Sequence, residues 1–570
     1  MSIQTIPLPF PAHGDDYVLF PACAYDGNRF PVLDKKYPPM FTPEEGKQAG
    51  GKPFITPVPR LGEDSSGILE VTAGDVSVPC IGVFSRAERK AVLLFTLQEI
   101  DRQNIGLAYE RGQMILTHPA RRREVYTMCT MTPQTEAWIP SGKEIPYKLL
   151  SFDCETMEQF FRVFFENRKC MGLDDTLPEV PSKEEQFEIQ KNKFNAMNWR
   201  ETEYGGFYAV GTTDNKFQVW QPGWTGGAMG TYAFLKCGGT IEKERSVKTL
   251  HHLFRTQGAS GLFWGICDKD GAFHSDGFGV PGTEKWTLIR KSADVLYFVL
   301  RQFELLEEIP AEFENGIRRC ADAFVRLCQE NGQLGQFADV ETGEITVGGS
   351  TSGGIAPAGL ALAYRYFGDS VYLETAQALA DHFYTHIQNG YTTGGPGEML
   401  QCPDSESAFG VLESFVWLYE ITGKEKYLSY ARAAADFCSS WVVPYNYRFP
   451  ETSEFARLGM KSVGSVFANA QNKHSAPGIC SLSGTSVYKV YKWTGDERYL
   501  TLYREITETV GQYMSTEARP IRALDGSILP PGFICERVNL SDWESTAWVG
   551  NVFNGSCWCE VSNLLWLAGM

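Results

Sequence analysis

The second half of the sequence repeats one local pattern three times. In each copy a predicted helix with one apolar face ends in aromatic residues and a glycine. Tyr-Leu follows within a few residues, near the start of a second helix of the same kind. The glycines are Gly368, Gly423 and Gly495. Glycine favours the left-handed conformation that ends a helix, so each copy predicts a helical hairpin with a very short connection. A repeated hairpin cannot bury its apolar face alone, so the copies must pack on one another.

Helical patterns continue from about residue 220 onward. We expect five pairs and a final helix, at 224–238 with 241–257, 286–307 with 311–330, 353–367 with 371–388, 405–422 with 425–440, 476–494 with 497–515, and 542–567. The first helix of each pair is richer in Gly, Ala, Ser and aromatic residues, whereas the second carries more charge. Small residues allow close helix packing and charge marks a solvated face, so first helices should line the inside of a closed ring.

The first 180 residues follow a different pattern. Residues 92–97 form a strand-like run, and residues 105–109 and 114–117 flank a turn, as in a β-hairpin. Short strands with frequent turns predict a β-sandwich domain over 1–180. Residues 156–167 and 183–198 are expected to be helical. The second of these is predicted to lie in a helical connector, 181–219, that precedes a ring domain over 220–570.

Composition limits the class of protein. The 570 residues are 43% hydrophobic and 21% charged, as expected for a globular chain with large cores. A net charge of −17 disfavours nucleic acid or an anionic membrane as a partner. No apolar run is long enough to span a membrane, and the first residues do not resemble a signal peptide. The 15 scattered cysteines are expected to be reduced, which predicts a cytoplasmic protein, and a homo-oligomer is compatible with these features.

A β-sandwich, a helical connector and about six two-layered helical hairpins together resemble the six-hairpin (α/α)6-barrel glycosidase superfamily. Two segments support the resemblance, Trp-Gln-Pro-Gly-Trp-Thr-Gly-Gly at 220–227 and Gly-Gly-Pro-Gly-Glu at 394–398. The implied fold class is α+β multidomain, an N-terminal β-sandwich followed by an (α/α)6 toroid. Members of this superfamily are mostly glycoside hydrolases, and related toroids are polysaccharide lyases and sugar epimerases.

In such a ring the segments before the inner helices converge at one end of the ring, around a single opening or mouth. Glycoside hydrolysis needs two carboxyl groups, one protonated near neutral pH and one ionised. The predicted catalytic carboxylates are Asp404, Glu406, Glu398 and Asp276. Aromatic, amide and charged side chains at the mouth are predicted to bind substrate: Trp220, Trp224, His274, Gln401, Asn472, Lys473, His474, Arg537, Trp543 and Glu544. No metal or cofactor site is predicted.

Four of these residues also have a structural interpretation. Asp404 suits the N-cap of the following helix. Glu398 follows a Gly-Gly-Pro-Gly stretch that either approaches a ligand or simply turns. Asp276 closes an Asp-rich segment that resembles a calcium loop but lacks its terminal Glu, which favours a turn. His474 is either a sugar ligand or acid–base group, or a satisfied structural histidine.

The resemblance implies a glycoside hydrolase acting on an oligosaccharide, including one that contains a uronic acid (β-glucuronidase-like). Arg537 and Lys473 would then pair with the substrate carboxylate. One alternative is a polysaccharide lyase or a uronic-acid or sugar epimerase, with His474, Tyr391 or Lys473 serving in proton abstraction. Another is a non-catalytic carbohydrate-binding protein, which the many carboxylates near the mouth disfavour because unused buried carboxylates are costly.

Overall fold

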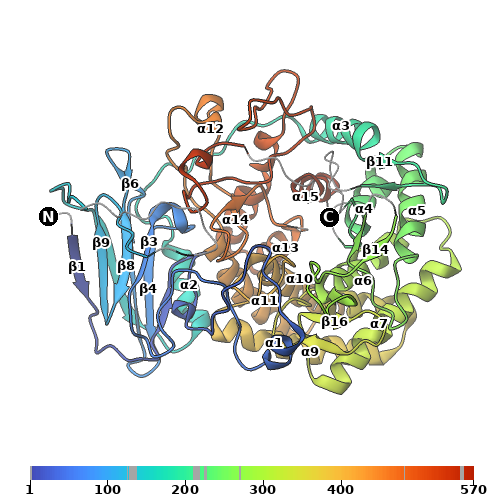
Figure 1. Ribbon diagram of the computed structural model, residues 1–570, viewed down its shortest axis with the longest axis horizontal. Coiled ribbons are helices and arrows are strands. Elements are labelled where there is room, and N and C mark those ends of the chain that lie inside the picture. The colour runs from blue at the N-terminus through green and yellow to red at the C-terminus, as the bar shows by residue number, and fades with distance from the viewer. Residues whose placement is uncertain are drawn as a thin grey trace.

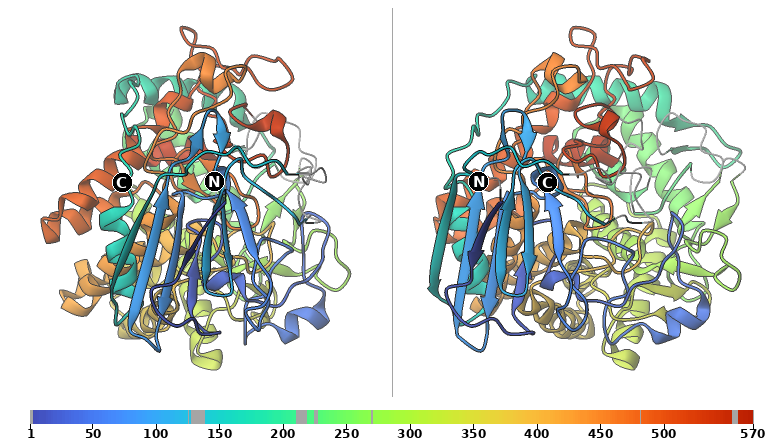
Figure 2. Two further views of the ribbon diagram at one scale, coloured as in Figure 1. Left: turned by 90° about the vertical axis from the view of Figure 1, so that its left-hand side faces the viewer. Right: turned by 60° about the vertical axis from the view of Figure 1, so that its left-hand side comes forward.

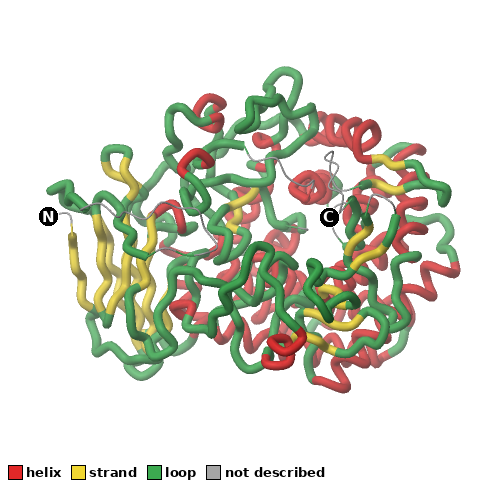
Figure 3. The backbone as a smooth tube through the Cα atoms, viewed as in Figure 1, coloured by secondary structure: helices red, strands yellow, loops and turns green. Residues whose placement is uncertain are grey.

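The computed structural model describes residues 3–124, 126, 138–209, 219–223, 227–268, 271–480, 482–552 and 558–569. Strands gather at one end of the molecule and helices form the larger part (Figure 1, Figure 3). The mixed sheet and helix architecture expected from the sequence is confirmed. Within these described ranges, no helix combines the length and apolar character needed to cross a bilayer.

Two four-stranded antiparallel sheets make up the strand-rich end, which faces the viewer in the left panel of Figure 2. The first sheet contains β1 (Ile3–Pro7), β9 (Gln113–Thr117), β8 (Gly106–Glu110) and β3 (Leu69–Thr72), in that order. The second contains β10 (Tyr147–Asp153), β5 (Lys90–Thr96), β4 (Cys80–Ser85) and β2 (Tyr17–Leu19). Alternate side chains of both sheets, such as Val71, Val83 and Leu107, meet in one hydrophobic core. The predicted β8–β9 hairpin is confirmed.

Helical hairpins follow in the predicted positions. The pairs are α4 (Ala228–Cys237) with α5 (Thr240–Phe254), α6 (Ile289–Phe303) with α7 (Ala311–Asn331), α8 (Ala356–Phe367) with α9 (Ser370–Asn389), α10 (Ser405–Thr422) with α11 (Glu425–Cys438), and α13 (Thr485–Thr494) with α14 (Glu497–Thr507). Gly368, Gly423 and Gly495 end the first helix of their pairs with φ of 77°, 63° and 69°. The repeated glycine therefore marks each turn because only glycine adopts this conformation without strain.

The first helices of the pairs pack against one another as an inner ring. Helix α6 contacts α4 and α8, α10 contacts α8 and α13, and α15 (Trp558–Leu567) contacts α4. Ser562 of α15 donates to the carbonyls of Ile479 and Leu482, ahead of α13, at 2.6 and 2.9 Å. A Cβ at Gly359 would lie 2.9 Å from Leu296, so the small residue is needed where α8 meets α6.

The outer partner of α15 comes from far earlier in the sequence. Helix α3 (Lys183–Lys193), expected to lie in a connector, packs along α15 (Figure 1). Lys193 and Glu560 form a fully buried ion pair at 2.5 Å, and Asn563 donates to Gln190 at 2.9 Å. Residues 542–552, expected to open the last helix, instead form loops and one 3-10 turn. The sixth pair is thus completed by a helix that precedes the ring.

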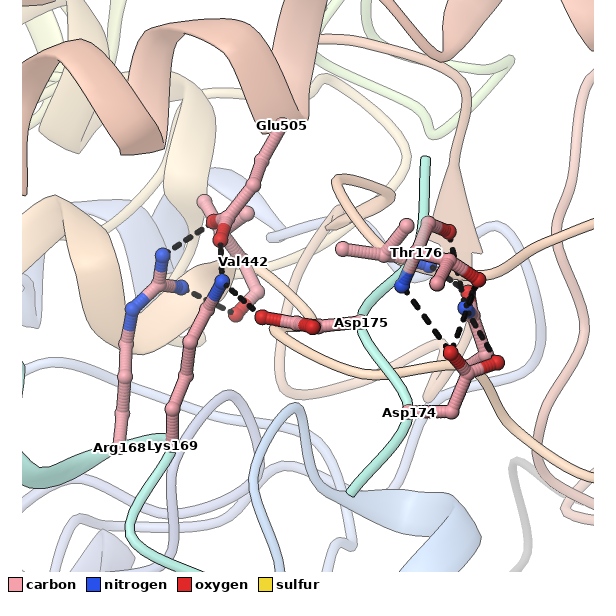
Figure 4. Close-up of polar contacts among 9 residues, drawn as sticks. Arg168, Lys169, Asp174, Asp175, Thr176, Val442 and Glu505 are labelled. Atoms are coloured by element: carbon pink, nitrogen blue, oxygen red, sulfur yellow. Dashed lines mark hydrogen bonds and ion pairs between the residues drawn. The ribbon is translucent and has the colours of Figure 1, made fainter. Parts of the chain in front are cut away.

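Helix α2 (Met157–Asn167) joins the sheets to the ring. Its Phe160 packs on Tyr17 of β2, and its Phe161 packs on Phe437 of α11, with ring centroids 5.8 and 5.0 Å apart. Just beyond α2, Arg168 donates to the Val442 carbonyl at 3.3 Å. Arg168 and Lys169 both pair with Glu505 of α14, and Lys169 also reaches Asp175 at 2.8 Å (Figure 4).

A long segment between β2 and β3 leaves the sheets and crosses the helical part, carrying α1 (Pro43–Gln48) with it (Figure 1). Its backbone pairs with the loop before α10, because Gln401 N–H donates to Phe54 O at 2.8 Å and Phe54 N–H donates to Gln401 Oε1 at 3.2 Å. Thr56 donates to Gln471 Oε1 at 3.3 Å. We call residues 30–58 the crossing segment. It brings the N-terminal region to the loops that precede the inner helices.

The remaining elements are short. They are β6 (Glu99–Ile100), β7 (Gln103–Asn104), β11 (Trp199–Arg200), β12 (Phe207–Tyr208), β13 (Ile266–Cys267), β14 (Phe273–His274), β15 (Trp286–Leu288), β16 (Phe337–Asp339), β17 (Ile345–Val347), α12 (Glu454–Leu458), β18 (Val466–Phe467) and β19 (Ser475–Ala476). Most of them lie in the loops between helices, so the loops at the mouth have regular hydrogen bonding rather than free ends.

Breaking the Lys193–Glu560 pair should destabilise the ring strongly. Lys193→Met leaves the Glu560 carboxylate buried without its cation, which typically costs about 3–5 kcal/mol. The double variant Lys193→Met/Glu560→Gln removes both charges and keeps an acceptor for the Ile534 N–H, 3.3 Å away. We expect scanning calorimetry to show a large fall in Tm for the single variant and recovery in the double one. Equal losses in both variants would contradict this role.

Candidate active site

The N-terminal ends of the inner helices meet at one opening, which we call the mouth. A small cavity there is lined by Arg290 and Asp294 of α6, Ser352 ahead of α8, Glu406 of α10 and Leu482 ahead of α13. The Asp404 and His474 stretches are adjacent through two hydrogen bonds. Ser405 N–H donates to Ala468 O at 3.0 Å and Ala468 N–H to His474 O at 3.1 Å. The predicted convergence of these segments is therefore confirmed.

A buried charge cluster forms the floor of the mouth. Arg290, in the first turn of α6, pairs with Glu406 and lies 3.3 Å from Asp294 through its Nε. All three side chains are at most 7% exposed. Glu406, a predicted catalytic carboxylate, is thus neutralised by a cation that the sequence analysis did not select. The available signal was a charged pair, Arg290-Lys291, at the start of an otherwise apolar inner helix.

Asp404 is the N-cap of α10, as its structural interpretation predicted. Its Oδ1 accepts from the Ser407 N–H at 2.7 Å, and its Oδ2 accepts from the Gly395 N–H at 3.2 Å. Complete burial raises the pKa of Asp404 to about 7, although both backbone bonds and the charge of Arg290 oppose the shift. Asp404 therefore anchors both the helix and the preceding loop.

Glu398 lies in the loop that Asp404 anchors. The loop is closed by a bridge between Thr393 and Pro403, and Gln471 donates to the Glu398 carbonyl at 3.4 Å. Burial raises the pKa of the Glu398 carboxyl, against the opposing charges of nearby Lys291, Arg290 and Arg537. In the described part of the chain, no other residue forms a hydrogen bond or ion pair with this carboxylate. Glu398 is therefore the predicted carboxyl that stays available to a ligand.

Arg537 provides the positive charge on another side of the mouth. It pairs with Glu544, and burial raises the pKa of the Glu544 carboxyl while Arg537 lowers it. Burial, followed by the charge of Arg537, holds the pKa of His474 well below its usual value, so this histidine is neutral. Because Arg537 acts on Glu398, Glu544 and His474 alike, these groups share one electrostatic environment.

Asp276 has the structural role that its turn interpretation favoured, with partners that were not predicted. Its Oδ1 lies 2.5 Å from the Lys291 ammonium, and its Oδ2 accepts from the Leu288 N–H at 2.8 Å. The carboxylate is 1% exposed and packs so closely that a Cβ at Gly265 would overlap it. Asp276 therefore fixes the loop before α6.

Two of the three tryptophans predicted to bind substrate, Trp220 and Trp543, are buried against other side chains of the protein. Trp220 is fully buried between Phe207 and His252, and Trp543 is 2% exposed and packs on Tyr126. Trp224 lies outside the described residues. Trp220 therefore belongs to a packed core, whereas Trp543 lines a small cavity with Asp75, Arg122 and Tyr126.

Four polar side chains that were predicted to bind substrate form hydrogen bonds to other groups of the protein. Gln401 bonds Phe54 and donates to the Gly348 carbonyl at 2.6 Å. Lys473 donates to the carbonyls of Ala470 and Cys23 and lies 5.3 Å from the Trp543 ring centre. Asn472 Oδ1 accepts from Gln471 at 3.2 Å, and exposed His274 bonds Asp268 at 2.7 Å. These contacts stabilise the loops of the mouth instead of leaving the side chains open to a sugar.

Three buried polar atoms near the mouth have no hydrogen-bond partner among the described residues: Ser352 Oγ, Thr393 Oγ1 and Asn469 Nδ2. Thr393 O accepts from Ser407 Oγ, and Asn469 bridges to Asp404, so both lie close to the Asp404 loop. Buried polar groups are nearly always satisfied, so water or a hydroxyl-bearing ligand would complete them. Within the described ranges, no three His, Cys, Asp or Glu side chains gather as a metal site.

No protein-family model and no curated protein matches this sequence. Solved structures with a similar arrangement include a D-mannose isomerase, with 11% identity over 68% of this chain and 97% of the other and a TM-score of 0.46. A glycoside hydrolase family 76 mannosidase from Bacteroides thetaiotaomicron has 12% identity, 68% and 97% coverage and a TM-score of 0.43. A cellobiose 2-epimerase from Spirochaeta thermophila has 11% identity, 68% and 95% coverage and a TM-score of 0.43.

Each of these likenesses has a TM-score below 0.5, so none of them supports an argument about the superfamily of this chain. Their identities and TM-scores are too low to assign the chain to a subfamily or to transfer an activity. The chemistry of this protein therefore follows from the arrangement of its own mouth residues.

The elevated pKa of Asp404 should make folding sensitive to pH. Because the folded-state pKa of about 7 exceeds the ordinary 3.8, its contribution to stability is complete below about pH 4 and is lost as pH rises through about 7. Asp404→Asn retains a capping oxygen but cannot ionise. We expect a smaller fall in Tm between about pH 5 and pH 8 than in the wild type, corresponding to at most about 3 kcal/mol. Identical pH dependence would show that the Asp404 carboxyl titrates normally.

Proposed function

We propose that this protein is a glycoside hydrolase that cleaves a neutral oligosaccharide at the mouth of the helical ring. The observation that carries the proposal is a pair of carboxyl groups, Glu398 and Glu544, both with a pKa raised by burial and both influenced by Arg537. They reach the mouth from different loops, one ahead of α10 and one ahead of α15. Paired carboxyl groups in unlike environments are what glycosidic cleavage requires.

The two environments suggest different roles. Glu398 has cations nearby but no ion pair with a described residue, so burial favours its protonated form. Glu544 pairs directly with Arg537, which favours the ionised form. Glu398 would then protonate the leaving glycosidic oxygen. Glu544 would activate water or attack the sugar, as the second carboxylate of such a pair does.

A neutral substrate fits the cations better than a uronic acid does. Lys473, one expected partner of a substrate carboxylate, is bound to the Ala470 and Cys23 carbonyls. Arg537, the other, already pairs with Glu544. A substrate carboxylate would have to displace Glu544 from Arg537 and would leave that partly buried side chain, 25% exposed, without its cation. The unsatisfied Ser352, Thr393 and Asn469 atoms instead suit sugar hydroxyls.

Sugar epimerisation or isomerisation is the second candidate function, and His474 favours it. This side chain is neutral, as a base must be before proton transfer, although burial and Arg537 lower its pKa and make it a weak base; Arg537 is near enough to stabilise a developing negative charge. The titles of the structural neighbours include both hydrolases and epimerases, so they favour neither reaction.

Glu398→Gln should reduce turnover about 10²- to 10⁴-fold, because proton donation by a positioned acid contributes on that scale. Glu544→Gln should cause a comparable loss in kcat. Glu497→Gln, on the exposed surface of α14, is the matched control and should retain full activity. Circular dichroism and Tm would verify that the variants are folded. Full activity in both Glu398→Gln and Glu544→Gln would overturn the assignment.

A substrate screen should separate the candidate reactions. We expect hydrolysis of neutral chromogenic glycosides and of their parent oligosaccharides, with glucuronides cleaved at least tenfold more slowly in kcat/KM. Reducing sugars incubated in D₂O should gain no carbon-bound deuterium. Deuterium incorporation without hydrolysis, abolished in His474→Gln and kept in Glu398→Gln, would establish epimerisation or isomerisation instead.

A further inference from the structure

Two large aromatic side chains remain exposed beside Glu398. Tyr37 of the crossing segment is 59% exposed, and Phe278 of the loop ahead of α6 is 39% exposed. Neither ring belongs to any hydrophobic cluster formed by the described residues. The protein buries most of its aromatic rings, so two solvated rings near an available carboxyl need an explanation other than packing.

Phe278 is held in an unfavourable backbone conformation. Its φ is 50°, in the left-handed region that a bulky residue rarely adopts. The surrounding loop is fixed by the Asp276–Lys291 pair and by Thr283, which donates to the Gly277 and Val280 carbonyls at 3.2 and 2.7 Å. Glycine would fit this φ without strain. Phenylalanine at position 278 therefore costs conformational free energy that glycine would avoid.

The phenyl ring lies against the loop that carries Glu398. A Cβ placed on Gly397 would be 4.0 Å from Cε2 and Cζ of Phe278, which is ordinary van der Waals contact. The Phe278 ring therefore lies beside Gly397, the residue that immediately precedes the proposed acid, Glu398, in the sequence. The glycine at 397 leaves the ring face uncovered by a side chain at this point.

Tyr37 belongs to the crossing segment, which meets the loop of Phe278 at Pro43, because a Cβ on Gly282 would lie 2.7 Å from Cγ of Pro43. Desolvation raises the pKa of Tyr37. The negative charge of Glu398 raises it further and Arg537 opposes the shift. The crossing segment is anchored near Tyr37, because Lys35 and Glu45 pair at 2.7 Å and Glu45 accepts from the Thr42 N–H at 2.8 Å.

We propose that Tyr37 and Phe278 form an aromatic subsite for a second sugar ring, adjacent to the ring whose bond is cleaved at Glu398. Exposed aromatic faces offer apolar area that matches the C–H face of a pyranose, while neighbouring polar groups bind its hydroxyls. This inference rests on the proposed function and refines it, since the substrate must contain at least two sugar units. It also assigns part of the binding site to the N-terminal region.

Binding should be measured separately from turnover. Full-length Glu398→Gln protein would be titrated by calorimetry with neutral di- and trisaccharides and with their monosaccharides, alone and combined with Tyr37→Ala or Phe278→Gly. We expect each aromatic substitution to weaken oligosaccharide binding at least tenfold and to leave monosaccharide binding unchanged. Tyr147→Ala, which removes a ring that is 42% exposed on β10, is the matched control and should have no effect.

Stability provides an independent readout at Phe278. If the ring serves binding, Phe278→Gly should lose affinity while its Tm stays equal or rises, because glycine relieves the positive φ. A fall in Tm with unchanged affinity would mean that Phe278 is structural and would overturn the proposal. So would oligosaccharide binding that neither aromatic substitution weakens, absence of any oligosaccharide binding, or a change in oligomeric state as the only effect. Oligosaccharide binding without cleavage by the wild type would refute hydrolysis but support the subsite.

Discussion

The buried ion pair between Lys193 and Glu560 is the contact on which the mouth depends. Helix α15 belongs to the inner ring, and its outer face is covered by α3, more than three hundred positions earlier in the sequence. Burying two charges costs several kcal/mol each, and the loss is offset only when both partners are present with good geometry. The Lys193 ammonium also lies 5.0 and 5.3 Å from the rings of Phe194 and Phe533. Such a pair accepts no other outer helix, so it selects α3 as the partner that closes the ring.

Closure of the ring has a direct consequence for the site. Glu398 lies ahead of α10 and Glu544 lies ahead of α15, which contacts α4 and bonds the Ile479 and Leu482 carbonyls ahead of α13 through Ser562. The crossing segment adds a second constraint. It is bonded to Gln401 and Gln471, which flank the Glu398 loop, so the N-terminal region holds the loop as well as supplying Tyr37. The mouth is therefore assembled from the whole chain.

The fold was largely predictable because its signals are local. Glycine at 368, 423 and 495 ends helices through one conformational property, and Asp404 begins α10 through its capping oxygen. The role of α3 was not predictable, because a charged amphipathic helix looks solvated until its distant partner is known. For the same reason Arg290 was missed, and Trp220 was assigned to the mouth although it packs in a core. Long-range partners leave no trace in local periodicity.

The location of a carboxylate ahead of an inner helix does not by itself indicate chemistry. Asp404, Glu406 and Asp276 all lie where convergence predicts, yet backbone N–H groups or cations satisfy each of them. Their role is to hold the helix ends and loops at the mouth in place. This leaves Glu398, whose carbonyl is bonded by Gln471 while its carboxyl is bonded to no other described residue. A fixed loop that holds a partly exposed acid without an ion pair to any described residue contributes little to stability. It is the arrangement that proton transfer needs, since the acid must already be positioned and desolvated when the substrate arrives.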